Sequence, residues 1–119
     1  MKYVLLIHHG DAPTPRDQEA WARLSEEEQK AIYADWQAIG TTPGVTPGLR
    51  MEAPETATTV RVEGGETLTT DGPFVAVKEA LGGLLTFEAD DLDAAIELAA
   101  RIPAARMGGA VEVRPVWEG

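Results

Sequence analysis

One carboxylate of the sequence stands in a turn that would hold it in place for proton transfer. Asp71 ends a predicted strand and is followed by Gly72 and Pro73. Proline fixes φ and glycine gives the turn its freedom, so a carboxylate here is well placed to act as a general acid or base. Asp-Gly-Pro is also ordinary turn chemistry, in which the aspartate accepts hydrogen bonds from nearby backbone N–H groups. The sequence leaves both interpretations of Asp71 open: catalytic residue or turn residue.

The two histidines, His8 and His9, are adjacent at the end of another predicted strand. Successive strand residues point to opposite faces, so the pair cannot easily bind one metal ion, and we expect no metal site. One of the two is expected to face a pocket, where an imidazole can act as a base or a hydrogen-bond donor. A capping or surface position is the alternative for each. Both are kept as candidate catalytic residues.

Four charged side chains are candidates for binding a ligand. Glu112 and Arg114 share one face of the last predicted strand, opposite the valines that alternate with them. An arginine there can hold a carboxylate or another anionic group through two hydrogen bonds. A mutual or intersubunit ion pair is the alternative, and structural ion pairs are common. The same two interpretations apply to Arg61 and Lys78.

The charge balance of the chain excludes some classes of partner. Ten basic and twenty acidic residues give a formal net charge of −10. Such a surface repels nucleic-acid phosphates and anionic lipid head groups, so we expect no direct nucleic-acid or membrane binding. A neutral or cationic small molecule, or a basic protein, is easier to accommodate.

Length indicates one domain, and the residue types are compatible with a reducing compartment. The 119 residues are predicted to form a single domain, residues 1–119. The absence of cysteine excludes a disulfide framework, a thiolate nucleophile and cysteine-based metal sites. The apolar run at residues 1–7 is too short for a signal peptide or a membrane span. We therefore expect a cytoplasmic protein.

Two helices are predicted from capping signals and apolar periodicity. The first begins at a capping box formed by Ser25 and Glu28, and it ends at Gly40. The second covers residues 92–101, with Asp90 as its expected N-cap. The apolar face of the first is formed by Ile32, Trp36 and Ile39. The apolar face of the second is formed by Leu92, Ala95, Ile96 and Ala99.

The rest of the chain is predicted as strands and turns. The Gly64-Gly65 pair marks a hairpin turn. Residues 42–48 hold two Pro-Gly dipeptides and are predicted as a turn-rich connection. Strands are predicted over residues 3–8, 49–51, 56–62, 66–70, 81–88 and 110–116.

These elements predict an α+β fold, a ferredoxin-like sheet with two helices on one face and an inserted hairpin. The other sheet face would then lie bare. The first strand is nevertheless apolar on both sides, with Tyr3, Leu5 and Ile7 on one and Val4 and Leu6 on the other. Because an exposed apolar sheet face would aggregate, we expect a homodimer in which two bare faces meet.

Several segments, taken together, resemble a known family. Among them are residues 1–7, Thr58-Thr59-Val60-Arg61, Thr70-Asp71-Gly72-Pro73-Phe74, Lys78-Glu79-Ala80-Leu81-Gly82-Gly83, residues 90–96 and residues 109–115. Over nearly its whole length the chain is similar to YCII-related proteins of the DGPF-domain type. The block from Asp71 to Gly83 and the ending around Arg114 are specific in combination, although each alone would be weak.

The resemblance implies a dimeric α/β-barrel, in agreement with the bare-face argument. Related dimeric barrels include small-molecule enzymes such as muconolactone isomerase and heme-handling monooxygenases. Proteins of the YCII type are implied to carry a histidine and an aspartate at the cleft, and Asp71 matches that aspartate. We therefore expect a small organic molecule to be bound or transformed in a dimer cleft, with Asp71 as acid or base and with no cofactor.

The same resemblance implies a second kind of function. Some DGPF domains are associated with extracytoplasmic-function sigma factors. The chain would then be a non-catalytic sensor or interaction module whose acidic surface docks a basic transcription-factor partner. The two histidines also motivate a third and weaker alternative, a heme-binding barrel.

Overall fold

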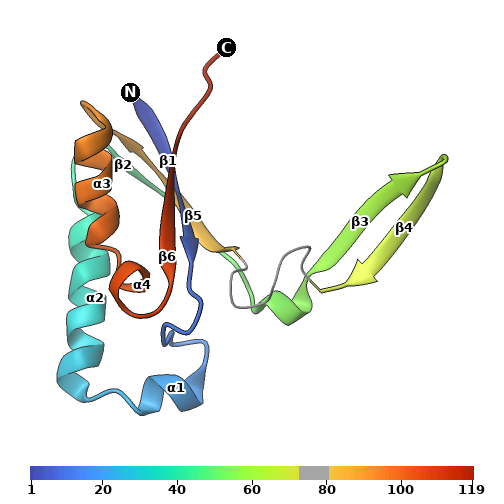
Figure 1. Cartoon of the computed structure of the whole chain (residues 1–119). Helices are drawn as coiled ribbons and strands as arrows, with labels where there is room; N and C mark the ends of the chain where they lie inside the picture. Colours follow the sequence, from blue (N-terminus) through green and yellow to red (C-terminus); the bar gives the residue numbers. More distant parts are fainter. Residues whose placement is uncertain (73–80) are drawn as a thin grey trace.

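The centre of the molecule is a four-stranded antiparallel sheet. The structure, a computed structural model, describes residues 1–72 and 81–119 (Figure 1). In the order in which they lie, the strands are β2 (Val45–Arg50), β5 (Leu81–Glu88), β1 (Lys2–His8) and β6 (Ala110–Pro115). Every neighbouring pair in this sheet is antiparallel. Together with the helices described next, the sheet confirms the predicted α+β class.

Two helices cover one face of this sheet, as expected from the sequence. They are α2 (Glu26–Gly40) and α3 (Leu92–Ala100), which lie on the same side of the sheet, with α3 above α2 in Figure 1. Two shorter helices accompany them, α1 (Gln18–Ala22) before α2 and α4 (Pro103–Arg106) after α3. None of the described helices combines the length and the apolar character that a membrane crossing needs.

The alternation of β1 decides where the core lies. Tyr3, Leu5 and Ile7 point toward the helices and are buried, with Leu5 completely withdrawn from solvent. They pack with side chains of β5, α2, α3 and the segment after α3, including Ile39, Leu85, Phe87, Ala95, Leu98 and Ile102. Burying a large aliphatic or aromatic side chain stabilises the fold by about 1.5–3 kcal/mol. This cluster therefore supplies most of the driving force for folding.

The opposite face of the sheet carries apolar side chains that no described helix covers. Val4 and Leu6 of β1 are half buried, as are Leu84 and Thr86 of β5. Register places Val4 beside Thr86 and Leu6 beside Leu84, so the four side chains form one patch. We call this surface the bare face. In the part of the chain that the structure describes, the sheet does not close into a barrel.

The predicted turn over residues 42–48 is wrong in its second half, because β2 already begins at Val45. The strand accommodates Pro47 and Gly48 through a register shift between Thr46 and Leu49. Proline has no N–H to donate to a neighbouring strand. It is tolerated here because β2 is an edge strand and the register shift removes the need for that hydrogen bond. Glycine is required because a Cβ at Gly48 would overlap the carbonyl of Leu84.

A hairpin is inserted between β2 and β5. It consists of β3 (Thr58–Glu63) and β4 (Glu66–Asp71), preceded by a 3-10 turn at Pro54–Thr56. Gly64 and Gly65 form its tip with φ of 56° and 79°, a left-handed pair that suits a tight hairpin turn. Figure 1 shows the hairpin standing away from the sheet. The radius of gyration, 16.1 Å, accordingly exceeds the value of about 13.5 Å for a compact chain of this length.

The observed N-cap agrees with the predicted one at α2 and differs from it at α3. At α2, Ser25 and Glu28 form the complete capping box that was predicted. At α3 the N-cap is Asp91 rather than Asp90, because its Oδ1 accepts the N–H of Ala94 at 2.9 Å. The predicted apolar face also shifts: the buried residues of α3 are Ala95, Leu98 and Ala99, whereas Leu92 and Ile96 are half exposed.

This cap leads to a first prediction. Asp91→Ala should lower the free energy of unfolding by about 1 kcal/mol, because one N–H in the first turn of α3 loses its acceptor. Asp90→Ala removes the same charge from the neighbouring exposed position and should change stability by no more than about 0.5 kcal/mol. Urea unfolding of the two variants beside the wild type measures both values. Equal losses in the two variants would contradict the assignment of the cap.

Candidate functional site

A cavity opens on the helix side of the sheet, between α2, the loop after β1, and the strands β2 and β5. Its volume is about 380 Å³, within the range that holds small organic ligands. Aliphatic side chains of the core form its floor, and Tyr33 and Trp36 of α2 form part of its wall. His9, Arg16, Arg50 and Glu52 are the titratable side chains among its other lining residues. We call it the His9 cavity.

His9 follows directly after the last residue of β1, and its side chain lines the cavity. A Cβ on Gly82 would overlap the Cδ2 atom of the His9 ring, so only glycine at that position leaves room for the imidazole. A Cβ on Gly83 would lie 2.9 Å from the carbonyl oxygen of Leu49, which is also too close. The two glycines thus allow the close approach that β5 needs at this end of the sheet.

The pKa of His9 lies below its ordinary value of 6.5. Burial of the ring is the largest cause, followed by the positive charges of Arg16 and Arg50. Each of these disfavours the protonated imidazole. His9 is therefore neutral near pH 7 and offers one nitrogen that accepts a hydrogen bond and one that donates.

Arg50 is held over the cavity wall by an aromatic ring. Its guanidinium carbon lies 5.6 Å from the centroid of the Trp36 ring, a cation–π contact. Trp36 was predicted to lie on the apolar face of α2. It is half buried and packs against the core, and it also lines the cavity and contacts Arg50.

Arg16 is brought to the cavity by the loop between β1 and α1. The loop turns at its start, where Ala12 donates its N–H to the His9 carbonyl at 2.8 Å. At its end α1 packs on α2, with the rings of Trp21 and Tyr33 edge to face at 5.4 Å between centroids. These two attachments keep Arg16 near His9 although its side chain is exposed.

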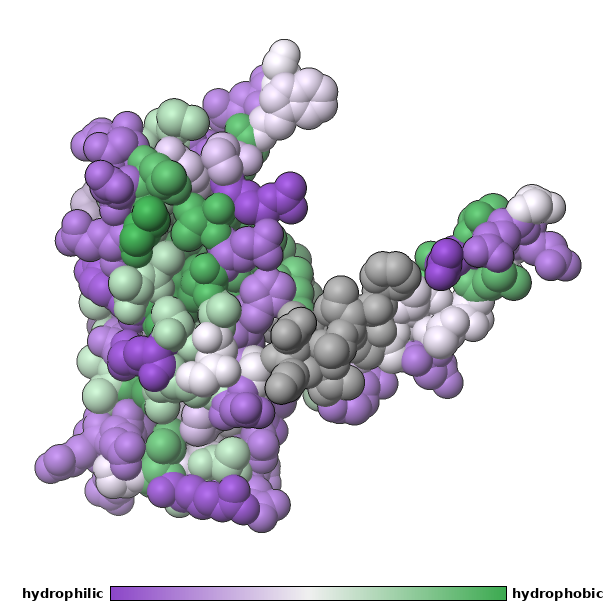
Figure 2. Space-filling view, in the orientation of Figure 1, coloured by the Kyte–Doolittle hydropathy of each residue, from purple (hydrophilic) through white to green (hydrophobic). Residues whose placement is uncertain are grey.

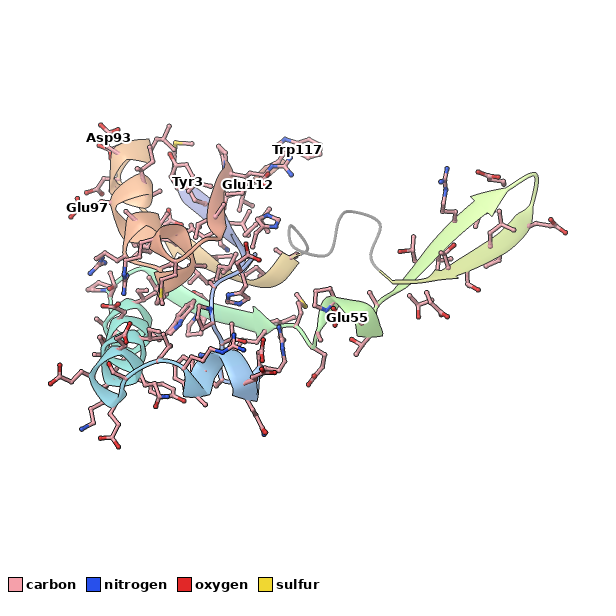
Figure 3. All side chains as sticks on the ribbon, turned by 60° about the horizontal axis from the view of Figure 1, so that its bottom comes forward. Tyr3, Glu55, Asp93, Glu97, Glu112 and Trp117 are labelled. Atoms are coloured by element: carbon pink, nitrogen blue, oxygen red, sulfur yellow. The ribbon has the colours of Figure 1, made fainter. Side chains whose placement is uncertain are left out.

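His8 lies on the opposite side of the sheet from the cavity. Its Nε2 atom is 3.4 Å from Oε1 of Glu112, and Arg114 Nε is 3.9 Å from the other oxygen of the same carboxylate. Figure 3 shows Glu112 on the side of the sheet that faces away from the helices. The predicted pair Glu112 and Arg114 thus contact each other and belong to the bare face rather than to the cavity.

The other residues selected from the sequence lie on the hairpin or outside the described residues. Asp71 is exposed at the end of β4, opposite Thr58, and is not among the described residues that line the His9 cavity. Arg61 is exposed on β3, with a nitrogen 3.3 Å from a carboxylate oxygen of Glu63. Lys78, like Pro73 and Phe74 of the DGPF motif, lies outside the described residues.

Sequence reasoning missed Arg16 and Arg50 as cavity residues. Arg16 follows Pro15 in a segment that was interpreted as a loop, and Arg50 follows Leu49 in a segment that was interpreted as a short strand. A usable signal was the proline-rich loop that directly follows His9, since such a loop has a fixed course and returns a charge to the strand end. Within the described residues, no three histidine, aspartate or glutamate side chains gather as metal ligands.

Comparison with known proteins decides the family. The family model of the YCII-related domain matches residues 1–119. The chain belongs to the YCII-related family. This YCII-related protein is also 31% identical, over 121 aligned residues, to an uncharacterized protein of Rhizobium meliloti (strain 1021). The alignment covers 98% of this chain and 92% of that relative, so the two resemble each other over their full domains.

The lowered pKa of His9 in this YCII-related domain predicts a pH dependence of stability. As pH falls below about 6.5, the unfolded chain takes up a proton on His9 before the folded chain does. The contribution of neutral His9 is therefore complete above that pH and is lost as pH drops toward the lowered folded pKa. Urea unfolding of wild type and His9→Gln from pH 8 to pH 5 should show their difference in stability shrinking below about 6.5.

Direct titration provides the control. In His8→Gln the His9 ring gives the only imidazole resonances, so its titration is read by NMR without ambiguity. A midpoint at or above the ordinary histidine value, or a stability difference that does not change with pH, would contradict a neutral His9 in the cavity.

Proposed function

We propose that this protein binds a small organic anion with an apolar body in the His9 cavity, and that His9 accepts a proton from it. The observation that carries the proposal is a neutral imidazole beside two guanidinium groups at the edge of an apolar cavity. An anionic group placed there would gain charge-assisted hydrogen bonds from Arg16 and Arg50. The aliphatic floor and the aromatic wall would take up the rest of the molecule.

The overall charge of the chain disfavours an anionic ligand, but the positive charges beside the cavity have the larger effect on binding there. A net charge of −10 favours neutral or cationic molecules at long range. At physiological ionic strength, charges farther than about 8 Å are largely screened. The two arginines act locally, since the positive charge of each lowers the pKa of His9. Glu52, which also lines the cavity, would restrict the anionic group to the side of the arginines.

Such a site supports one kind of chemistry. A neutral imidazole can remove a proton from a weakly acidic C–H or O–H group of the bound anion, and becomes imidazolium as it does so. The negative charge left on the ligand would be stabilised by the guanidinium groups of Arg16 and Arg50. The proton is then available on His9 for return to another atom of the same ligand.

Asp71 is the competing acid or base. It stands on the hairpin of the DGPF-type motif, apart from the His9 cavity of its own chain. A carboxylate that acts as a general base is usually withdrawn from water, and Asp71 is exposed. In a dimer, the second chain would shield Asp71 from water. The experiment that follows therefore tests both His9 and Asp71 as the acid or base.

A ligand panel read by thermal unfolding separates the candidates. Benzoate and phenylacetate should raise the Tm of the wild type, while benzamide and phenylacetamide, of the same shape but uncharged, should not. Arg16→Gln and Arg50→Gln should each weaken carboxylate binding roughly 10- to 100-fold, the loss of a charge-assisted hydrogen bond of about 1.5–3 kcal/mol. Arg61→Gln and Arg114→Gln remove the same charge elsewhere and should leave the shift unchanged.

The Asp71→Asn variant decides between the two versions. It should bind the carboxylates as the wild type does if the His9 cavity is the site. Loss of the shift in Asp71→Asn or Arg114→Gln, with Arg16→Gln and Arg50→Gln unaffected, would move the site to the dimer cleft. A wild type that responds to no carboxylate would favour the other proposed function, an acidic module that docks a basic, transcription-linked protein.

We further propose that the sheet is ferredoxin-like and that two copies of the chain join bare faces into a dimeric α/β-barrel. The half-buried patch of Val4, Leu6, Leu84 and Thr86 supports this, because apolar sheet faces are rarely left to solvent. The polar contacts of Glu112 with His8 and Arg114 would border it as a polar rim.

Sedimentation equilibrium tests this assembly. The wild type should have about twice the chain mass of 12.7 kDa. Leu6→Lys should be a folded monomer: the new ammonium group lies beside Glu112, its register neighbour, and is acceptable in one chain but not inside an apolar interface. Ala34→Lys makes the same charge change on the exposed side of α2 and should remain dimeric. A monomeric wild type, or a dimeric Leu6→Lys, would overturn the proposal.

A further inference from the structure

The β3–β4 hairpin exposes nearly all of its side chains. In the two strands only Thr59 is partly buried, and Val60 and Val62 are 59% and 66% exposed. The hairpin is nevertheless fixed at its base, where Gly72 donates its N–H to the Ala57 carbonyl at 2.6 Å and Thr59 Oγ1 donates to the Gly72 carbonyl at 2.7 Å. It is a well-formed arm without cover from the described part of its own chain.

The two faces of the arm differ in charge. Register places Val60 opposite Thr69 and Val62 opposite Thr67, and this face holds no charged residue except Asp71 at its base. The other face carries Arg61, Glu63 and Glu66, with Leu68 and the threonines Thr59 and Thr70. Such alternation is typical of a strand pair with one face packed and the other in water. In a chain of net charge −10, an uncharged face of this length indicates a surface that packs against another surface.

Leaving the arm exposed to solvent would lower its stability and favour aggregation. A two-stranded hairpin by itself is at best marginally stable in water. Exposed strands rich in β-branched residues are also templates for edge-to-edge aggregation. The uncharged face defined by Val60, Val62, Thr67 and Thr69 therefore needs a partner surface that is apolar and large enough to receive it.

The bare face of the sheet borders the same open space as the arm. Figure 1 shows the arm leaving on the side of the sheet opposite to α2 and α3, and Figure 3, turned by 60°, shows the same relation. Figure 2 shows hydrophobic residues on the far half of the arm and a wide gap between that half and the body of the molecule. One chain therefore presents two uncovered surfaces, the apolar bare face and the uncharged face of the arm, that it does not bring into contact with each other.

We propose that the arm clasps a second copy of this chain, with the face of Val60 and Val62 packed on the partner's sheet beside its bare face. This inference rests on the dimer proposed above and adds the role of the arm. A two-fold axis uses each surface twice, so both arms and both bare faces are covered and the assembly closes. A second copy of the chain accounts for both surfaces at once. Asp71, on the same face of the arm, would lie at the edge of the interface.

Charge substitutions on the two faces of the arm test the proposal. Val60→Asp with Val62→Asp should weaken the dimer at least 10-fold in Kd, because two carboxylates would be buried without partners. Leu68→Asp with Thr70→Asp adds the same two charges to the other face and should change Kd less than 3-fold. Sedimentation equilibrium measures Kd, and thermal unfolding followed by circular dichroism shows that each variant is folded.

Crosslinking gives a second measurement that does not depend on stability. The chain has no cysteine, so Val62→Cys and Thr86→Cys each introduce a single thiol. Mixing the two variants with a short bismaleimide should give a covalent heterodimer, which neither variant gives with Ala34→Cys on the exposed side of α2 as its partner.

Each outcome separates the two proposals. A monomeric wild type would overturn both the dimer and the clasp. A dimer that Leu6→Lys dissociates but Val60→Asp with Val62→Asp does not would leave the dimer standing and overturn the clasp. Crosslinking within one chain of a Val62→Cys, Thr86→Cys double variant, in place of crosslinking between chains, would show the arm folded onto its own sheet and would also overturn it.

Discussion

The burial of alternate side chains on β1 is the constraint on which the rest of the structure depends. Tyr3, Leu5 and Ile7 point into the core, and β1 is hydrogen-bonded on both edges, to β5 and to β6. A shift of one residue in either register would turn these side chains to the bare face and bring Leu6 and His8 inside. The energetic cost of that exchange fixes the strand. It therefore also fixes which histidine reaches the cavity and which reaches Glu112.

The electrostatics of the His9 cavity follow from this placement. Burial disfavours a charged imidazole, and Arg16 and Arg50 add to that effect. The arginines remain exposed, so their charges are hydrated and do not need a buried counter-ion. An acidic protein thus contains one small region where the local charge is positive and the histidine is neutral. That combination favours an anion far more than the net charge of the chain would indicate.

The single chain leaves two apolar surfaces uncovered, and they have different origins. The bare face exists because both long helices pack on the same side of the sheet. The uncharged face of the arm exists because β3 and β4 pair only with each other in the described sheets. Neither surface is a defect of packing, since Leu5 and its neighbours form a complete core without them. They are better understood as parts of a larger assembly.

Local signals were enough to predict the elements whose structure depends on neighbouring residues. The capping box of Ser25 and Glu28, the hairpin around Gly64-Gly65 and the strand over residues 81–88 all appear as expected, because caps, tight turns and strand periodicity act over a few residues. The family resemblance likewise came from short motifs spread along the chain.

The tertiary structure alone decided the rest. β2 pairs through a bulge that only its contact with β5 makes favourable, and two adjacent aspartates compete for one cap position. The meeting of Arg50 with His9 and Arg16 joins β2 to the loop after β1, two segments far apart in sequence, and Asp71 is carried away from them on the arm. Spacing along the chain cannot reveal such a site, because sheet order and loop course determine which charges share a cavity.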